Sequence, residues 1–471
     1  MKIRNIILYA AMAFGLSAAA QSVDQVRVYI NPGHGSWTAN DRPCTLVGHG
    51  EYSRFNTDTL SFFETNTNLY KAYGLLDKLR EMGLKYNDAL NLGNGELNRW
   101  EIGPARDLSN NIVMSHCKAG PYYDDNGTAT QLTSDGKDVP FDLAYYNRSL
   151  SEVAAEVDQN NFDCFISIHS NAASEGTNTN FPLFLYRGWD NCTVPSTVTD
   201  FGTDTQSESK AMAEACWKYI YGNEHQPWTN YSLTNMNVRG DISFYGSSSL
   251  NSTTGARAYL GVLHHNVPGF LSEGYFHTYQ PSRHRAMNSD VSRLEGVAYA
   301  RGIADFFGFE KGSKGEIYGI VRDMHEKFSD VAYTANATSD DKYLPLNGAK
   351  VILSNSEGVC GEYTTDNYYN GAFVFSGLAE GTYTVSVEIA GYKAAEPVTV
   401  VVKPAETSYT KVFLESESYE PPKIVYENYP DPVAGAEGFH LFSQYNMGTA
   451  TESQLVAADV LAGKEIDRYE V

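Results

Sequence analysis

The sequence predicts an α/β protein with a mixed, twisted sheet flanked by helices, followed by a smaller all-β sandwich. Up to Phe307, short apolar runs alternate with segments of helical periodicity, which is typical of a sheet with right-handed crossovers. From Glu316 onward the apolar residues alternate with period two, as in antiparallel strands. A chain of 471 residues, 42% of them apolar, is long enough for about two or three domains with ordinary cores.

The charge of the chain limits its partners. The formal net charge is −22. Nucleic-acid binding requires a basic face, so this balance argues against a nucleic-acid partner. A solvated acidic surface is the simplest interpretation of the excess.

The N-terminus has the pattern of a targeting segment over residues 1–20. Lys2 and Arg4 precede a short apolar core, and three alanines before Gln21 form a small-residue cleavage site. No later stretch reaches about 18 unbroken apolar residues, so no stable membrane span is expected. We expect export, to the periplasm or to the extracellular space or cell surface.

The cysteines do not form a recognisable framework. None of the six belongs to a C-x-x-C pair, which argues against thiolate metal ligands. Cys164 lies within an apolar strand-like run and is expected to be a buried free thiol. Export permits disulfides, but the sequence does not show which, if any, of the cysteines pair; they are Cys44, Cys117, Cys164, Cys192, Cys216 and Cys360.

Two predicted strands end in a histidine. The run VRVYI, Val26 to Ile30, passes into the turn NPGHG with His34, and the run FISIHSNA, Phe165 to Ala172, contains His169. In open α/β sheets the chemistry lies at the carboxyl ends of the strands. One such histidine is usually structural, but two in one domain favour a pair of metal ligands.

A helix is predicted after the first histidine turn, and it offers a candidate acid. Glu64 lies near its N-terminal end, and the helix ends at Gly83. An acid in a first turn commonly only complements the helix dipole. Glu51 is a competing acid, but no helical pattern follows it. The periodic apolar positions of the helix are Leu69, Tyr73, Leu76, Leu79 and Met82.

The remaining elements of the α/β part follow from the same periodicities. Polar insertions separate them. The predicted elements are a strand at Ile112 to Met114, a helix from Tyr145 to Val157, a strand at Pro182 to Tyr186 and a helix from Glu208 to Tyr221.

The run from Leu260 to Phe276 contains the most informative acid. We expect a strand, a turn at Asn266 to Pro268, and a second strand that ends with Glu273. An ionised carboxylate at the end of an apolar strand is costly to bury without a partner or a task. Glu273 is therefore a candidate catalytic residue.

Other polar residues of this region are weaker candidates. His264 and His265 are adjacent and would point to opposite faces of a strand, so they cannot serve one metal and are expected to be structural or peripheral. His277 and Arg283 could line a substrate cleft or lie on the surface.

Four motifs together resemble the zinc-dependent N-acetylmuramoyl-L-alanine amidases of bacterial cell walls. They are NPGHG at Asn31, ETNTNL at Glu64, SIHSNA at Ser167 and PGFLSEGYF at Pro268. The resemblance covers residues 26–307 and implies that His34, Glu64 and His169 bind Zn²⁺ and that Glu273 is catalytic. The family has Asn four residues and Leu five residues after its glutamate, and here Asn68 and Leu69 select Glu64 over Glu51.

The chain departs from that family at three places. The segment between His34 and Glu64 is longer, Ser115-His116 replaces a Thr-Arg pair, and GYFHT replaces the usual G-F-x-S-N ending. All three lie in predicted loops that would contact substrate.

The chemistry implied by this set is coherent. Two imidazoles and one carboxylate suit zinc with an open fourth position, better than calcium or magnesium. Bound zinc would polarise an amide carbonyl, and Glu273 would take a proton from water and pass it to the departing amine. The sequence has neither a G-x-S-x-G elbow nor a phosphate-binding G-x-x-x-x-G-K-[ST] loop.

The second domain is predicted after a linker at Gly312 to Gly315. Phe373 and Phe375, then Tyr383 after a glycine turn, alternate as in a small antiparallel sandwich. It resembles the carboxypeptidase regulatory-like domain of transthyretin type, which implies a spacer or surface-binding role. The expected domains are 25–311 for the zinc amidase, 314–416 for the sandwich, and 417–471 for a linker with a possible further β unit.

The leading hypothesis is therefore a secreted zinc amidase that cleaves the bond between N-acetylmuramic acid and L-alanine in peptidoglycan. One alternative is a non-catalytic wall- or glycan-binding protein, which a missing site residue would favour. The other is a zinc exopeptidase or carboxypeptidase, a class that usually carries H-x-x-E. None of the 11 histidines is followed by glutamate at that spacing.

Overall fold

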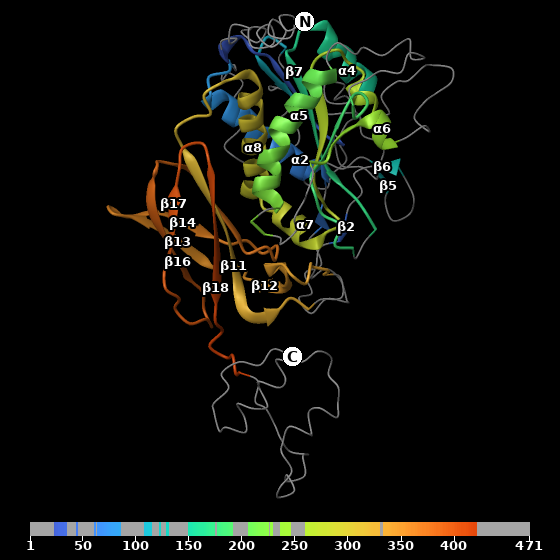
Figure 1. Ribbon diagram of the computed structural model, residues 1–471. Helices are drawn as coiled ribbons and strands as arrows, with labels where there is room; N and C mark the ends of the chain where they lie inside the picture. The colour runs from blue at the N-terminus through green and yellow to red at the C-terminus, as the bar shows by residue number, and fades with distance from the viewer. Residues whose placement is uncertain are drawn as a thin grey trace, which may run out of the picture. The chain divides into compact units, whose positions relative to one another are not determined.

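The computed structural model describes the parts of the chain that carry the predicted site (Figure 1). Residues Met1–Ser416 form one compact unit and Glu417–Val471 a second. The predicted targeting segment, Glu51, Ser115-His116 and residues 422–471 lie outside the described residues. The described ranges are 23–34, 44–45, 61–62, 64–85, 108–114, 122–123, 129–130, 149–174, 177–191, 206–225, 227–228, 236–245, 260–329 and 333–421.

A six-stranded mixed sheet forms the centre of the α/β part, which confirms the predicted fold class. Its order is β4-β1-β7-β10-β8-β9; the first four strands are parallel, β8 is antiparallel to β10, and β9 is parallel to β8. The strands are β1 (Val28–Pro32), β4 (Ile112–Met114), β7 (Cys164–Asn171), β8 (Leu183–Tyr186), β9 (Val238–Gly240) and β10 (Gly269–Phe276).

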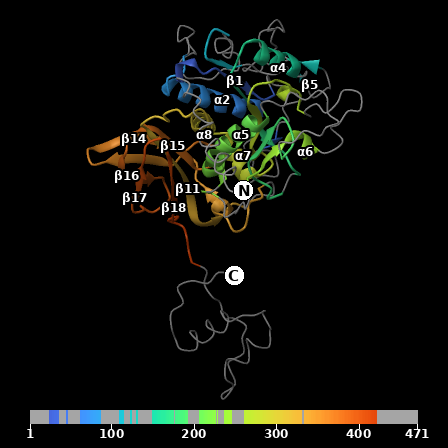
Figure 2. The ribbon, with the colours of Figure 1, turned by 45° about the horizontal axis from the view of Figure 1, so that its top comes forward.

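Helices cover both faces of this sheet (Figure 2). One face packs against α2 (Glu64–Glu81), α5 (Gln206–Ile220) and α8 (Ser289–Phe307). The other packs against α4 (Leu150–Gln159) and a 3-10 turn, Gly261–Leu263. Because both faces are covered, the central strands are apolar on both sides, as in other sheets with parallel strands. Shorter helices are α6 (Asp241–Tyr245), α7 (Gln280–Ala286) and a π-helical turn, Tyr221–His225.

Local sequence signals account for several helix ends. Ser149 begins α4 with a capping box that includes Glu152. Asn288 caps α8, and Gly308 ends it in the left-handed conformation with φ of 80°. Helix α2 begins at Glu64 and is followed by Gly83 with φ of 108°, at the predicted end.

The expected strand at the start of the 260–276 run is wrong. Residues 261–263 form a 3-10 turn, and only the second part of the run, β10, is a strand. Val262 and Leu263 are both buried in the cluster that contains Val153 and Val157 of α4. Consecutive residues of a strand point to opposite faces, so a turn is what lets this adjacent pair face the same helix.

The second part of the compact unit is an all-β sandwich of two four-stranded sheets. Phe373, Phe375 and Tyr383 are buried in its core, as the period-two pattern predicts. It is not wholly antiparallel, because β18 pairs in parallel with β11. The strands are β11 (Gly315–Lys327), β12 (Tyr343–Pro345), β13 (Lys350–Asn355), β14 (Gly358–Thr364), β15 (Ala372–Leu378), β16 (Gly381–Glu388), β17 (Val398–Val402) and β18 (Thr407–Leu414).

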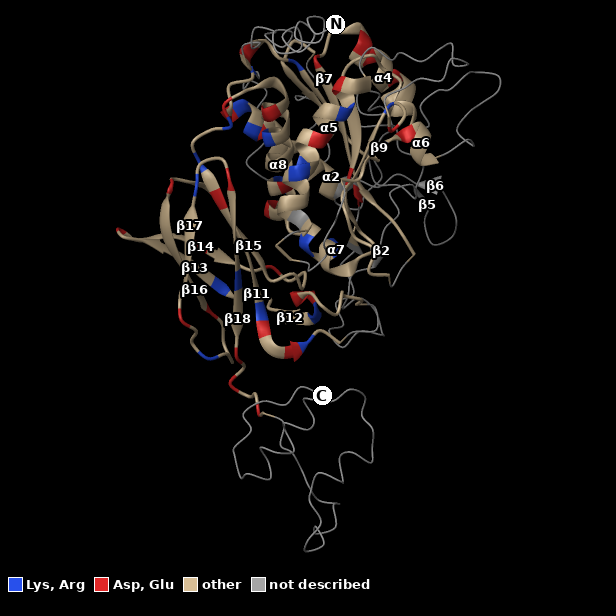
Figure 3. Ribbon diagram, in the orientation of Figure 1, with Lys and Arg blue, Asp and Glu red and all other residues tan. Residues whose placement is uncertain are grey.

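Buried charges join α7 to β11 and to the short 3-10 helix Asp340–Lys342. Asp341 Oδ1 accepts hydrogen bonds from Arg285 Nη1 and Arg322 Nη2, each at 2.8 Å. Its Oδ2 accepts a bond from Tyr279 Oη at 3.0 Å. Elsewhere, Figure 3 shows acidic and basic residues interspersed along the described helices and strands.

Two predictions about the wider chain can be compared with the described residues. Cys164 is a buried free thiol, as expected, and Cys216 and Cys360 are also free. Among the described helices, none is long and apolar enough to cross a membrane.

Candidate metal centre

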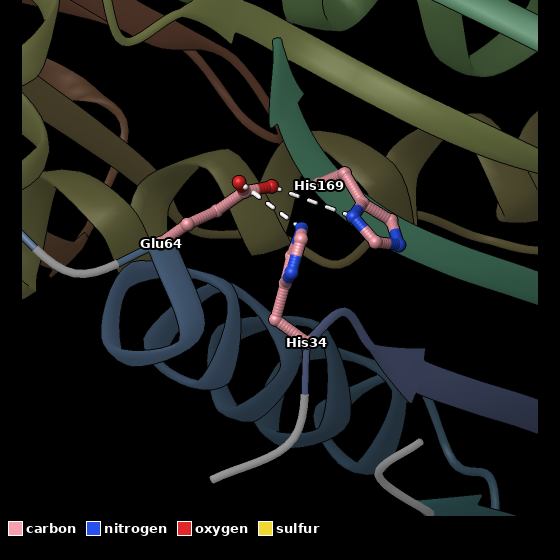
Figure 4. Close-up of side chains that lie close together, drawn as sticks. All are labelled: His34, Glu64 and His169. Carbon is pink, nitrogen blue, oxygen red and sulfur yellow. Dashed lines mark ion pairs between the residues drawn. The ribbon is translucent and has the colours of Figure 1, made fainter. Parts of the chain in front are cut away.

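The structure brings together the three side chains that the motifs select as metal ligands (Figure 4). His34 lies in the turn after β1, Glu64 is the first residue of α2, and His169 lies near the end of β7. One potential ligand atom from each residue lies within 4.8 Å of the other two. Strand ends and a helix start therefore converge at the carboxyl edge of the parallel strands, where sites of open α/β sheets lie.

The carboxylate of Glu64 faces both imidazoles. Its Oε2 lies 3.1 Å from His34 Nε2, and its Oε1 lies 3.4 Å from His169 Nδ1. The two rings stand edge to face, with centroids 5.0 Å apart. The Glu64 side chain is 3% exposed, whereas those of His34 and His169 are 22% and 17% exposed. The cluster is thus closed behind the carboxylate and accessible on the histidine side.

The NPGHG turn has a backbone conformation that sets the positions of both histidines. His34 adopts φ of 69°, which is uncommon for a residue other than glycine and is typical of functional sites. A Cβ on Gly33 would lie 2.2 Å from Cε1 of the His169 ring. The Gly33 N–H donates to Ile168 O at 2.8 Å, so this turn is joined directly to β7. Glycine is therefore required for the ring of His169 to lie against the turn.

A buried polar contact holds the ends of β1 and β7 together. Ser167 Oγ donates to Asn31 Oδ1 at 2.8 Å, and neither residue is exposed. The two residues are also register partners in the parallel ladder. The asparagine that opens the NPGHG motif thus fixes the strand ends that carry the two histidines.

The electrostatics of the cluster favour an ionised Glu64 and a neutral His169. Burial raises the pKa of Glu64, but the charge of His34 and hydrogen bonds to both histidines outweigh it, so the pKa lies well below its usual value. Burial lowers the pKa of His169, although its bond to Glu64 opposes this shift. An ionised carboxylate beside a neutral imidazole is the form that can bind a cation.

Glu64 has further partners that fix its rotamer. The Ser170 N–H donates to Oε1 at 2.8 Å, and Asn68 Nδ2 lies 3.4 Å from the same oxygen. On the other side, His277 Nδ1 lies 3.9 Å from Oε2. Asn68 is one helical turn after Glu64, which gives a physical role to the asparagine at this spacing.

Glu273 lies on the strand next to His169. The two residues are register partners in the parallel pair of β10 and β7, so their side chains leave the same face of the sheet. Glu273 is half-buried, and the register of the pair shifts immediately after it. The register therefore places Glu273 next to His169 on the same face of the sheet.

Of the other polar residues of the 260–283 region, His277 lies against Glu64 of the cluster, whereas His265 lies away from it. His265 is buried and its ring lies 4.5 Å from that of Phe165, in the apolar layer. His277 and Arg283 are each 2% exposed, so neither lies on the surface.

The sequence motifs did not predict the buried ion pair that lies behind the cluster. Lys71 Nζ lies 3.0 Å from Glu295 Oε1 of α8, and it donates to His169 O at 3.3 Å. Glu295 also accepts from Tyr299 Oη at 2.9 Å. Lys71 lies two helical turns after Glu64 and so shares its face of α2, which is the only sequence feature that connects it to the site.

The donor set fits a zinc ion. Two imidazole nitrogens and one carboxylate oxygen are the ligands of many catalytic zinc sites, and such sites keep one position open for water or substrate. The two histidines are partly exposed, whereas the carboxylate is buried. Sulfur ligands are not close: none of the described cysteines belongs to the group of His34, Glu64 and His169.

Solved structures similar to this chain include amidases. The CwlD amidase from Clostridioides difficile, in complex with the GerS lipoprotein, is 13% identical with a TM-score of 0.33, and the match covers 60% of this chain and 99% of that one. The N-acetylmuramyl-L-alanine amidase Ami1 from Mycobacterium smegmatis is 16% identical with a TM-score of 0.33, covering 61% and 98%.

A third similar structure is the catalytic domain of CwlV, an N-acetylmuramoyl-L-alanine amidase from Bacillus (Paenibacillus) polymyxa var. colistinus. It is 15% identical with a TM-score of 0.31, and the match covers 61% of this chain and 100% of that one. No protein-family model and no curated protein matches the chain. Similarity of this extent carries no functional argument, so the chemistry has to be inferred from the residues of the site.

Proposed function

We propose that this chain is a metal-dependent hydrolase of amide bonds. The observation that supports this most strongly is the convergence of His34, Glu64 and His169, with Glu273 in register beside His169. These three residues would hold Zn²⁺, and bound zinc supplies Lewis acidity at a carbonyl oxygen and a water of lowered pKa.

The chain's own groups account for the proton transfers. The carboxylate of Glu273 would accept a proton from the attacking water as the new C–O bond forms. It would then give this proton to the amine nitrogen as the C–N bond breaks, so that one water is consumed for each amide cleaved. A positioned carboxylate of this kind contributes roughly 10²- to 10⁴-fold to the rate.

Within this class we propose an N-acetylmuramoyl-L-alanine amidase of peptidoglycan. The support is the resemblance of four motifs, in order, to that family, together with the convergence of the residues that they select. The targeting pattern of residues 1–20 fits an exported enzyme that meets its substrate outside the cytoplasm. Catalysis would belong to residues 25–311, and the sandwich of residues 314–416 would act as a spacer or surface-binding module.

The test uses the mature chain and purified peptidoglycan sacculi. We expect wild-type protein loaded with zinc to release stem peptides that begin with a free L-alanine amine, measured by mass spectrometry. Glu273→Gln should bind zinc as wild type does and release peptides at least about 100-fold more slowly. Glu357→Gln, at an exposed turn of the sandwich, is the matched control and should leave the rate unchanged.

Three results would count against the proposal. Wild-type release by Glu273→Gln would remove the base from the mechanism. Cleavage within the peptide, with no free L-alanine end, would favour the exopeptidase alternative. Binding to sacculi with zinc bound and no cleavage would favour the non-catalytic alternative.

A further inference from the structure

His277 lies behind the candidate metal centre, although it belongs to none of the three ligand positions. It follows β10 and is 2% exposed. Its Nδ1 lies 2.9 Å from Ser170 Oγ and 3.9 Å from Glu64 Oε2. One ring nitrogen thus faces both the end of β7 and the carboxylate of a proposed ligand.

Ser170 connects this histidine to Glu64 through two separate atoms. Its backbone N–H donates to Glu64 Oε1 at 2.8 Å, while its side-chain Oγ bonds to His277 Nδ1. Ser170 also directly follows His169 in β7. A shift of Ser170 would therefore move the N–H that donates to Glu64. It would also move the backbone next to His169.

The backbone of His277 is held as firmly as its ring. Its N–H donates to Asn171 O at 2.8 Å, which continues the contact between β10 and β7 beyond the register shift. Its carbonyl accepts a bond from Arg283 Nε at 2.6 Å. The ring lies 5.3 Å from that of Phe62, between centroids. These contacts give Nδ1 a fixed direction.

We propose that His277 is a positioning residue of the metal centre. Its Nδ1 orients Ser170, and the two residues together hold Glu64 with Oε1 toward His169 and Oε2 toward His34. Outer partners that orient ligands in this way typically contribute about 10- to 100-fold to metal affinity. The inference rests on the proposed metal centre, and it assigns a role to a residue that is neither ligand nor proposed base.

The test measures zinc affinity of the apoprotein by competition with a chromogenic chelator, and activity is not needed. Asparagine places a polar atom close to the position of histidine Nδ1, whereas glutamine places one close to Nε2. We expect His277→Leu and His277→Gln to lower zinc affinity by about 10- to 100-fold, and His277→Asn to stay within a few-fold of wild type. His265→Phe, at a buried histidine of the apolar layer, is the matched control and should bind as wild type does.

A second variant keeps the test decisive if a substitution of His277 does not fold. Ser170→Ala removes the Oγ partner with a change of one atom and should lower zinc affinity by the same factor. The double variant with His277→Leu should lose little more than either single change, because both remove one contact. Thermal unfolding of each apoprotein establishes that the variants are folded.

The outcomes separate the two proposals. If wild-type protein binds no zinc, the proposed function fails. If wild type binds zinc but His277→Leu and Ser170→Ala bind it equally well, the positioning role alone is overturned. Equal losses for His277→Asn and His277→Gln would also overturn it, because they would show that Nδ1 has no special part.

Discussion

Two clusters of ionisable residues in this protein are built in different ways. Around Asp341, two guanidinium groups and a phenol all donate to one carboxylate, so each oxygen of the acid is satisfied by the chain itself. Around Glu64, two imidazole nitrogens face the carboxylate across 3.1 and 3.4 Å. The first cluster converges donors on an acceptor. The second places two imidazole nitrogens, which can share lone pairs with a cation, beside a carboxylate that also accepts from the Ser170 N–H.

The comparison separates charge that stabilises a fold from charge that, under the proposed function, would bind a metal ion. A buried ion pair with complete partners adds little net stability. Removing one partner is strongly destabilising, because the remaining charge is left uncompensated. Groups that require an added ion contribute binding free energy instead. The same residue types thus have different roles, and the arrangement of donors and acceptors distinguishes them.

The largest expected effect is on the Glu64 cluster. Glu64→Gln removes the charge and replaces one oxygen with a donor that cannot bind a cation. We expect zinc affinity to fall by more than about 100-fold, beyond the range for an outer partner, with little loss of apoprotein stability. Chelator competition and thermal unfolding measure the two quantities. A variant that kept wild-type zinc affinity would remove Glu64 from the ligand set.

The next effect concerns stability alone. Asp341→Ala leaves Arg285 and Arg322 buried without their shared acceptor, and we expect the free energy of unfolding to fall by about 3–5 kcal/mol. Urea unfolding measures it, and zinc affinity should not change. Asp340→Ala, at the neighbouring half-exposed acid paired with Lys411, is the matched control with an expected loss below about 1 kcal/mol. Equal losses for the two variants would break the distinction between the clusters.

The next prediction concerns the buried Lys71–Glu295 ion pair behind the site, for which we expect a smaller loss of stability. Lys71→Met leaves Glu295 in an apolar site, and burial already raises the pKa of Glu295, so this acid can take up a proton. We therefore expect a loss of roughly 3 kcal/mol, at the low end for a broken buried pair. The double change Lys71→Met with Glu295→Leu should recover most of it, as measured by urea unfolding. A double variant less stable than the single one would show that the pair does more than compensate its own charges.

The smallest effect is a pH dependence that arises outside both clusters. Burial, and then the charge of Arg187, lowers the pKa of His265 to about 3. The unfolded chain takes up a proton near pH 6.5 and the folded chain does not, so stability is present above pH 6.5 and is lost as the pH falls toward 3. The slope is about 1.4 kcal/mol per pH unit. His265→Phe should therefore gain about 2 kcal/mol on wild type between pH 7 and pH 5.

This measurement uses urea unfolding of the two proteins at both pH values. A constant difference between them would show that His265 is protonated in the folded chain.

Local signals predicted most of the α/β part. The apolar runs at β1, β4, β7 and β8 are strands, and the periodic segment that starts at Glu64 is a helix that ends before Gly83. These elements are apolar on one stripe or on both faces, so their pattern fixes their type. The 3-10 turn at Gly261–Leu263 could not be predicted in this way, because its conformation depends on packing against α4.

The candidate site was predictable where its residues belong to contiguous motifs. His34, Glu64 and His169 were each marked by a strand end or a helix start, and the structure brings them together. The contacts of Ser170, His277 and Lys71 were not predicted. They join residues that lie far apart in the sequence: 98 residues separate Lys71 from His169, and 107 separate Ser170 from His277. Nothing in a single sequence specifies such pairs. The parallel pairing of β18 with β11 was missed for the same reason, since register across a sandwich is a tertiary property.

Gly33 determines how closely the main chain approaches the His169 ring. The backbone at Gly33 lies so close to the His169 ring that one added carbon would be 2.2 Å from Cε1. That side of the imidazole is therefore sealed by the main chain, and Glu64 occupies the side facing α2. Among the described residues, these two contacts occupy the Gly33 side and the Glu64 side of the ring. Glu273, the register partner of His169 on β10, borders the ring from the neighbouring strand.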